Sequence, residues 1–182
     1  MLLACLTPGA AHAAGLELEL SPGVAVSQDS TAVAPVIRGR AGLGFSYLTP
    51  SLLVFGALSG DPGPPAHQNQ SGGIDAWGLA AEVRVHNSGS NQFGLALGAG
   101  VGQLTVTQQS GGDLASFRGH VAPYVEAAVG YRHQGDGIRF GLDATLDIFN
   151  RVDFVSDFNP GPRGSSWLLG LAITVGWRLR PF

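Results

Sequence analysis

The sequence predicts an all-β fold: an eight-stranded, antiparallel, up-and-down transmembrane β-barrel. Three observations predict it. Apolar residues alternate with small or polar residues at a period of two over most of the chain, which is the pattern of β-strands. Only 13% of the 182 residues are charged, about half the usual share of ~25%, and 28 residues are glycine. The expected connections are alternately short and long, as in bacterial membrane barrels.

Composition excludes several other classes of protein. The net charge is −3, and the ten basic residues are all arginine without a basic cluster, which argues against a nucleic-acid-binding protein. Hydrophobic residues make up 45%, too many for a disordered chain. Cys5 is the only cysteine, so neither a disulfide framework nor a cysteine-based metal site is expected. We therefore expect no metal and no cofactor, and no apolar run reaches the ~18 residues of a membrane-spanning helix.

Residues 1–13 are predicted to be an export signal. A short apolar stretch precedes Ala11-His12-Ala13, which fits an A-x-A cleavage site. The usual positive segment is missing, which indicates that the signal is truncated at its start. Cleavage after Ala13 leaves residues 14–182 as a single barrel domain. Two alternatives are an ordinary apolar N-terminus and a lipidated Cys5, although four preceding residues are too few for a lipoprotein signal.

The last segment, residues 167–180, alternates most clearly. Trp167, Leu169 and Leu171 share one face with the apolar residues that follow, and small or charged residues occupy the other face. Residues 138–148 behave in the same way. Six further segments complete the eight expected strands, and the third of them is apolar on both faces: 16–27, 33–48, 52–60, 76–86, 92–107 and 120–132.

The connections fall into two groups. Short turns are expected at 49–51, 87–91 and 134–137, on the periplasmic side. Long polar loops, rich in glycine, proline and aspartate, are expected at 61–75, 108–119 and 149–166, on the extracellular side. The connection 28–32 is short but falls on the side of the long loops.

The composition of the polar face favours a membrane barrel over a water-soluble barrel. An eight-stranded lumen is only wide enough for side chains to fill it. Small residues on one strand then make room for large residues on its neighbours. The glycine-rich face of 92–107 lies between two segments that carry Glu82, Arg84, Tyr124 and Glu126, and this arrangement is expected inside a narrow lumen.

Charged residues on the polar faces are nearly balanced in number. Buried charges must be paired to be tolerated, and arginine pairs with carboxylates through two hydrogen bonds. We therefore predict a charge network in the lumen, with solvated surface charges as the alternative. Its expected members are Glu17, Glu19, Arg38, Arg40, Glu82, Arg84, Glu126, Arg132, Arg139, Asp143, Asp147, Arg178 and Arg180.

Aromatic residues on the apolar faces are predicted to form two girdles. Trp167 and Trp177 are ten residues apart on one face. At ~3.3 Å per residue and a tilt of ~40°, this spacing corresponds to roughly 25 Å, the height of the apolar band of such barrels. Trp77 is expected to join Trp167 at the rim of the long loops. The other girdle would hold Tyr47, Phe93, Tyr131, Phe140 and Trp177.

With these features in place, the chain resembles the small eight-stranded bacterial outer-membrane proteins of the OmpA transmembrane-domain and OmpX type. The C-terminal Phe182 resembles the terminal aromatic residue that the barrel-assembly machinery reads in such proteins. Thr174-x-Gly176-x-x-Leu179 resembles the start of that signal, but Phe182 is out of phase with Leu179. The resemblance implies a monomer in the bacterial outer membrane, among lipids that include lipopolysaccharide.

The leading hypothesis for function is a non-enzymatic outer-membrane barrel, with a structural role or with loops that contact partners outside the cell. Acidic residues in or next to the loops could attract cations, but none has the spacing of a calcium loop, so solvated acids are favoured. These residues are Asp61, Asp75, Asp113, Asp153 and Asp157.

Two alternatives belong to other classes of protein. His86-Asn87-Ser88 has the His-x-Ser spacing of lipid A deacylases, which suggests a lipid A-modifying enzyme. No carboxylate lies between Ser88 and Asp113 to orient the histidine, and both side chains fall at the short-turn end, so a plain turn is favoured. The other alternative is a soluble exported barrel that binds an apolar ligand inside.

Overall fold

The computed structural model describes residues 15–28, 32–59, 72–110, 113–135, 137–156, 159–160 and 164–179. The predicted export signal at 1–13, Arg180 and Phe182 lie outside the described residues. No helix in the described ranges is long and apolar enough to cross a membrane.

All regular structure in the described part of the chain is β-strand. The strands are β1 (Gly15–Ser27), β2 (Val33–Gly44), β3 (Leu48–Leu58), β4 (Gly72–His86), β5 (Asn91–Ser110), β6 (Asp113–Gly119), β7 (Ala122–Gln134), β8 (Ile138–Ser156), β9 (Asn159–Pro160) and β10 (Gly164–Leu179).

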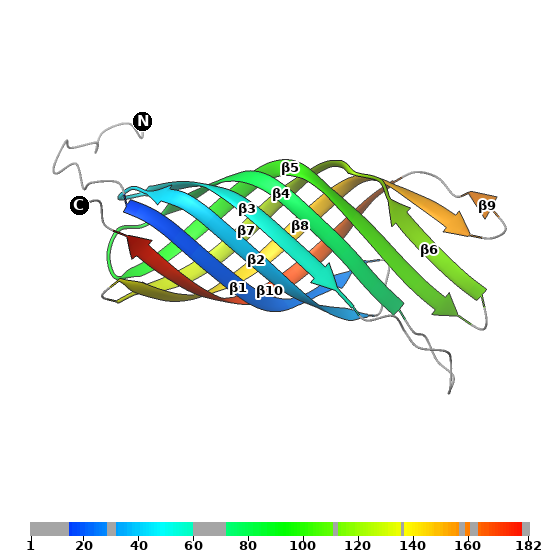
Figure 1. Ribbon diagram of the computed structural model, residues 1–182, viewed down its shortest axis with the longest axis horizontal. Helices are drawn as coiled ribbons and strands as arrows, with labels where there is room; N and C mark the ends of the chain where they lie inside the picture. The colour runs from blue at the N-terminus through cyan, green and yellow to red at the C-terminus, as the bar shows by residue number, and fades with distance from the viewer. Residues whose placement is uncertain are drawn as a thin grey trace, which may run out of the picture.

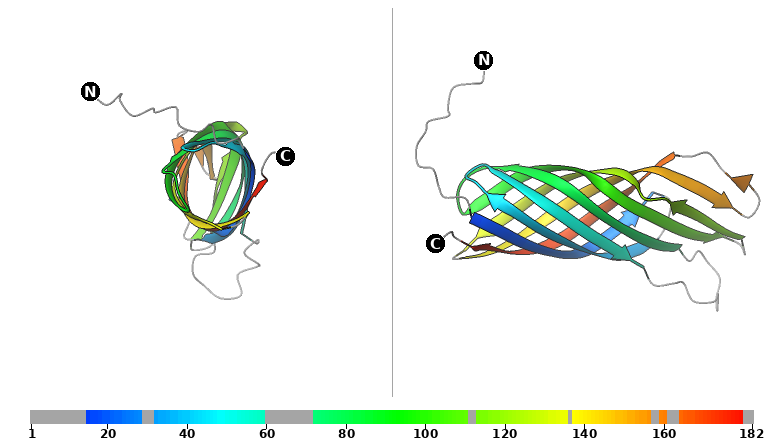
Figure 2. Two further views of the ribbon diagram at one scale, coloured as in Figure 1. Left: turned by 90° about the vertical axis from the view of Figure 1, so that its left-hand side faces the viewer. Right: turned by 45° about the horizontal axis from the view of Figure 1, so that its top comes forward.

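The strands form one closed antiparallel barrel (Figures 1 and 2). β1 pairs with both β2 and β10, which closes the sheet. β6 and β7 share one position in the wall, because both pair with β5 on one side and with β8 on the other. β9 pairs with β8 at its far end. The barrel wall therefore has eight strands, and the predicted fold class is confirmed.

The first short turn lies earlier in the chain than the sequence predicts. β2 ends at Gly44, and Phe45 N–H donates to the Leu48 carbonyl at 2.9 Å, which closes a turn at 45–47. Residues 49–51, expected to be the turn, belong to β3. Pro50 and its polar neighbours suggested a turn, but Pro50 lies close to the start of the strand, where a missing donor is tolerated.

The long connections are shorter than predicted because the strands continue into them. β5 has 20 residues and β8 has 19, whereas ~9–11 residues cross a membrane. β5 pairs with β6 from Thr105–Arg118 to Ser110–Asp113, and β6 also pairs with β8. The paired strands thus extend one side of the barrel at the end opposite the start of β1 and the end of β10 (Figure 1). Backbone pairing continues there although the apolar alternation fades.

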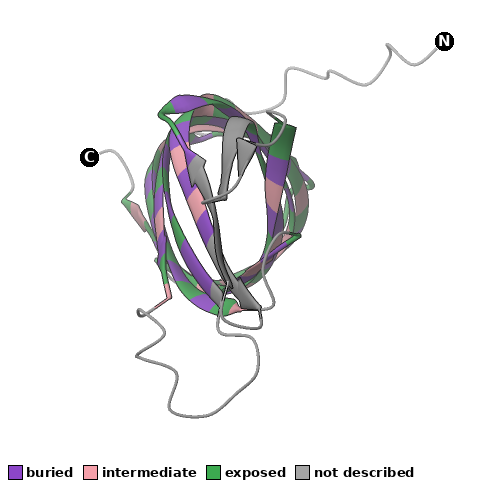
Figure 3. Ribbon diagram, turned by 90° about the vertical axis from the view of Figure 1, so that its right-hand side faces the viewer, coloured by how far each residue is buried: buried purple, intermediate pink, exposed green. Residues whose placement is uncertain are grey.

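Where burial is described, the outer face of the wall is apolar and the inner face is buried, in alternation along the strands (Figure 3). Leu97 is 71% exposed and Leu171 is 64% exposed, whereas Arg38 and Glu126 on the inner face are 1% exposed. A water-soluble barrel would have the opposite arrangement. The outward apolar band is the surface that hydrocarbon covers in a transmembrane barrel, and it contradicts the soluble alternative.

The lumen is divided into two parts along its length. The half towards the long connections holds buried apolar side chains, which we call the apolar plug: Ala25, Ala34, Val36, Leu53, Phe55, Ala57, Ile74, Ala76, Ala80, Leu104, Val106, Tyr124, Phe149 and Leu168. Leu53 and Phe55 explain why 52–60 is apolar on both faces: one face meets lipid and the other fills the plug. The inner face is therefore apolar in this half of the lumen.

Small residues leave the room that the large lumen side chains occupy. Gly98 pairs with Glu82 on β4 and with Glu126 on β7, so a glycine lies between two glutamates on the inner face. Gly78 is similarly placed beside the rings of Phe55 and Tyr124. The predicted small-to-large complementarity is confirmed at these positions.

Gly78→Val is expected to destabilise the barrel. A Cβ at Gly78 would lie 2.8 Å from the Tyr124 ring and closer still to Phe55, so these rings would have to move. Overpacking of this kind costs about 1–3 kcal/mol. Urea unfolding in lipid vesicles would measure the loss. Gly98→Ala is the matched control, because its Cβ has no neighbour nearer than 3.4 Å. Equal stability of the two variants would contradict tight packing of the plug.

Candidate functional site

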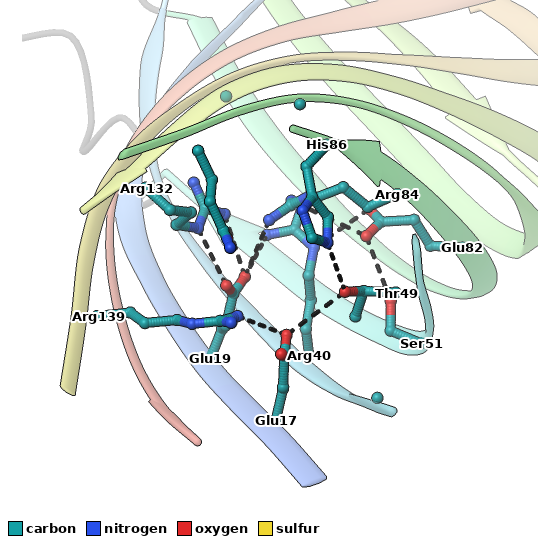
Figure 4. A pocket seen from close by; sticks show the side chains of 14 residues that line it. Glu17, Glu19, Arg40, Thr49, Ser51, Glu82, Arg84, His86, Arg132 and Arg139 are labelled. Atoms are coloured by element: carbon teal, nitrogen blue, oxygen red, sulfur yellow. Dashed lines mark hydrogen bonds and ion pairs between the residues drawn. The ribbon is translucent and has the colours of Figure 1, made fainter. Parts of the chain in front are cut away.

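The half of the lumen towards the short turns is filled by ion pairs between arginines and carboxylates (Figure 4). Arg40 lies at its centre. Its guanidinium is 3.1 Å from both Glu82 Oε2 and Asp143 Oδ2, 3.2 Å from Glu126 Oε1 and 3.9 Å from Glu19 Oε2. These four carboxylates come from β4, β8, β7 and β1. One cation on β2 thus joins four other strands across the lumen.

Arg132 on β7 binds two of the same carboxylates. Its Nε and Nη2 donate to the two oxygens of Glu19, each at 3.0 Å. Its Nη1 and Nη2 donate to Asp143 at 2.9 and 2.6 Å. Arg84 Nη1 donates to Glu19 at 3.3 Å. Glu19 and Asp143 each have several arginine partners, which compensates for the loss of their hydration on burial.

Arg38 connects the charge network to the apolar plug. It forms ion pairs with Asp147 and, at 3.2 Å, with Glu126. Its guanidinium carbon also lies 4.7 Å from the centroid of the Phe55 ring, a distance suited to a cation–π contact. The two halves of the lumen therefore meet at Arg38, whose guanidinium contacts carboxylates on one side and an aromatic ring on the other.

The mouth of the lumen at the short-turn end is polar. Arg139 Nη1 donates to Glu17 Oε2 at 2.5 Å, and Arg178 Nε lies 3.6 Å from Glu17 Oε1. Thr49 links Glu17 to His86, at 3.5 and 3.3 Å. Arg178 is more exposed than the arginines deeper in the lumen, with 19% of its side chain accessible.

All twelve described members of the predicted network lie on the inner face, and six carboxylates face six arginines. They are Glu17, Glu19, Glu82, Glu126, Asp143 and Asp147 with Arg38, Arg40, Arg84, Arg132, Arg139 and Arg178. The void left between them is about 20 Å³. This is roughly the room that one water molecule needs, so the lumen here is packed rather than open.

The predicted girdle residues lie on the outer face of the wall. Tyr47, Phe93, Phe140 and Trp177 are 60, 67, 55 and 45% exposed, and Trp77 is 40% exposed. Tyr131 and Trp167 are half-buried. The Phe93 and Tyr131 rings lie 5.0 Å apart. Tyr47 lies in the turn itself rather than in a strand.

Among the described side chains, the features that suggested catalysis or ion binding do not come together into a site. His86 hydrogen-bonds with Thr49 and with the Asn87 carbonyl, and Ser88 is exposed in the turn. Asp75 points outward, whereas Asp61 and Asp157 lie outside the described residues, as do the side chains of Asp113 and Asp153. Within the described ranges, no group of three His, Cys, Asp or Glu side chains is placed to hold a metal ion.

The sequence reasoning missed the apolar plug. Its signal was present: apolar residues stand at inner-face positions near the long-connection end of several strands. Val36, Phe55, Ile74, Leu104, Phe149 and Leu168 all break the apolar–polar alternation in this way.

No protein-family model matches the sequence, and no curated protein matches it at a significant level. Solved structures do match the fold. Neisserial surface protein A has a TM-score of 0.57 at 9% identity, over 93% of this chain and 99% of its own. Ail, the attachment invasion locus protein of Yersinia pestis, has a TM-score of 0.54 at 10% identity, over 92% and 99%.

A major outer membrane protein from Thermus thermophilus is also similar in fold. Its TM-score is 0.56 at 14% identity, over 92% of this chain and 100% of its own. These matches confirm the resemblance to small outer-membrane β-barrels at the level of fold. The predicted location, the bacterial outer membrane, agrees with this fold and with the apolar band on its outer face.

Proposed function

We propose that this protein is a non-enzymatic outer-membrane barrel with a structural or surface-interaction role. The observation that carries the proposal is the burial pattern: large apolar side chains face outward while paired charges and the apolar plug fill the lumen. A filled eight-stranded lumen does not work as an open porin. The protein would be a monomer, inserted by the barrel-assembly machinery and surrounded by lipids that include lipopolysaccharide.

The extended strands support a surface role. β5 and β8, with 20 and 19 residues, are longer than a strand needs to be to cross the bilayer, and β6 pairs with their extended ends. Two proteins of similar fold are named a surface protein and an attachment invasion locus protein. We extend the surface role to this chain as part of the proposal and leave the partner open.

The first test is the mobility of the membrane fraction on an SDS gel with and without boiling. A closed membrane barrel is expected to stay folded in SDS until it is heated and therefore to shift on boiling. Recovery of the protein in the soluble fraction without a shift would overturn the proposal. The lipid A of expressing cells should be unchanged; a Ser88-dependent change in its mass spectrum would favour the enzymatic alternative.

Cysteine labelling can test which end of the barrel faces the outside of the cell. In a Cys5→Ser background, Ser165→Cys, exposed near the start of β10 on the side of the long connections, should react with a membrane-impermeant maleimide on intact cells. Ser88→Cys, in a turn at the opposite end, should react only after the outer membrane is permeabilised. The reverse labelling pattern would show that the long connections face the periplasm.

A further inference from the structure

A groove of about 400 Å³ crosses the outward face of β5, β7, β8 and β10. Its floor includes the two smallest outward side chains in its lining, Ala127 on β7 and Ala144 on β8, which lie diagonally across the strand pair, opposite Leu146 and Val129 respectively. Leu97 pairs with Ala127 on one side, and Leu169 pairs with Leu146 on the other. The groove is therefore a depression in the apolar band, between two leucine walls.

The floor of the groove lies in the half of the membrane nearer the short turns. Ala127 is four residues from Tyr131, and Ala144 is four residues from Phe140, both in the predicted girdle at that end. Four residues at ~3.3 Å and a tilt of ~40° correspond to about 10 Å, less than half of the ~25 Å apolar band.

A polar cluster lies at the short-turn end of the same two strands. Asn91 Oδ1 accepts a hydrogen bond from Tyr131 O–H at 2.8 Å and lies 2.8 Å from His133 Nδ1. Asn91 pairs with His133, and Phe93 with Tyr131 in the next outward pair. Leu95–Val129 and Leu97–Ala127 follow towards the groove. The outer face of β5 and β7 therefore changes from polar to aromatic to apolar over six residues of each strand.

We propose that this surface binds one phospholipid of the periplasmic leaflet. An acyl chain would lie in the groove against Ala127 and Ala144, and the headgroup would meet Asn91 and His133. The groove is continuous with the outward apolar band, which makes hydrocarbon its natural occupant. The proposal rests on the membrane location proposed above and adds a defined lipid site to it.

A second copy of the chain fits the groove less well. Ten residues line the groove, whereas stable protein interfaces use about 20–30 residues on each side. The neighbouring outward side chains project strongly, with Leu97 71% and Leu171 64% exposed, so a second convex barrel would not reach the floor. A single flexible chain can follow the floor without displacing these leucines.

The test is native mass spectrometry of the full chain extracted from outer membranes in mild detergent. The folded protein should retain one phospholipid. Ala127→Leu together with Ala144→Leu fills the groove and should lower the retained fraction roughly tenfold. Asn91→Ala with His133→Ala should also lower it, with the groove intact. Ala41→Leu is the matched control, an outward alanine on β2 away from the groove, and should retain lipid as the parent does.

The gel shift on boiling separates this proposal from the proposed function. All variants should shift, which shows that they remain folded membrane barrels. Equal phospholipid retention by the parent, the groove variant and the Ala41 variant would overturn the lipid site alone. Retention of lipopolysaccharide in place of phospholipid, or a cross-linked dimer through the groove, would overturn it as well. Loss of the shift in the parent protein would instead overturn the membrane location.

Discussion

Arg40→Leu is expected to destabilise the barrel by about 3–5 kcal/mol, the cost of breaking a buried ion pair by removing one partner. Arg40 is the common partner of Glu19, Glu82, Glu126 and Asp143, so its removal leaves several buried carboxylates with fewer cations. The free energy of unfolding can be measured by urea titration in lipid vesicles, with tryptophan fluorescence as the signal. The shift on boiling, measured on a gel of the membrane fraction, reports the same loss of stability for protein made in cells.

Two further variants make this result specific to the charge network. Arg178→Leu should cost less, because Arg178 lies at the mouth and is partly exposed to water. Arg40→Leu combined with Glu82→Gln should be less destabilised than the sum of the two single variants, since one unpaired carboxylate is removed with the arginine. If Arg40→Leu unfolds at the same urea concentration as the parent protein, the network contributes nothing to holding the strands together.

The apolar plug is expected to block the lumen to ions. Phe55, Tyr124 and Phe149 are each 2% exposed, with ring centroids 5.8, 6.2 and 5.3 Å apart. The parent protein should therefore pass no measurable current in a planar lipid bilayer. Replacing all three residues by alanine should raise the current measurably but leave it small, because the packed charge network still fills the other half of the lumen. Each aromatic-to-alanine change also costs about 3–5 kcal/mol in stability.

The control for this experiment uses aromatic residues on the opposite face of the wall. Phe93→Ala with Phe140→Ala removes two outward rings and should leave the barrel without current. The gel shift must show that the triple variant is still a folded barrel before its current is interpreted. A folded triple variant that conducts no better than the parent would show that the charge network alone closes the lumen. A conducting parent protein would show that the plug does not close it.

The sequence predicted the number of strands in the wall and, in the segments that alternate clearly, the face on which the residues lie. Periodicity is a local property, because successive side chains of a strand point to opposite sides. Residues 138–148 and the described part of the last segment, 167–179, therefore predicted their inner and outer faces correctly. The opposite signs and similar numbers of charges on the inner face predicted that arginines and carboxylates would meet in the lumen.

The sequence could not predict the ends of the strands. The alternation depends on the contrast between lipid and lumen, and this contrast fades where β5 and β8 extend beyond the bilayer. Backbone hydrogen bonds to a neighbouring strand continue without it. At 49–51 the sequence predicted a turn inside a strand. Proline and serine suggested the turn, although the backbone there is already paired.

Only the tertiary structure determined which residues lie at the same level along the barrel axis in the lumen. Arg40 reaches four carboxylates because the registers of β1, β4, β7 and β8 bring them to one level, and the register depends on the pairing of whole strands. The same registers gather Phe55, Tyr124 and Phe149 into the plug. They also place Ala127 beside Leu97 in the outer groove. The sequence by itself thus determined the faces of the residues that alternate clearly, and the closure of the barrel determined their partners.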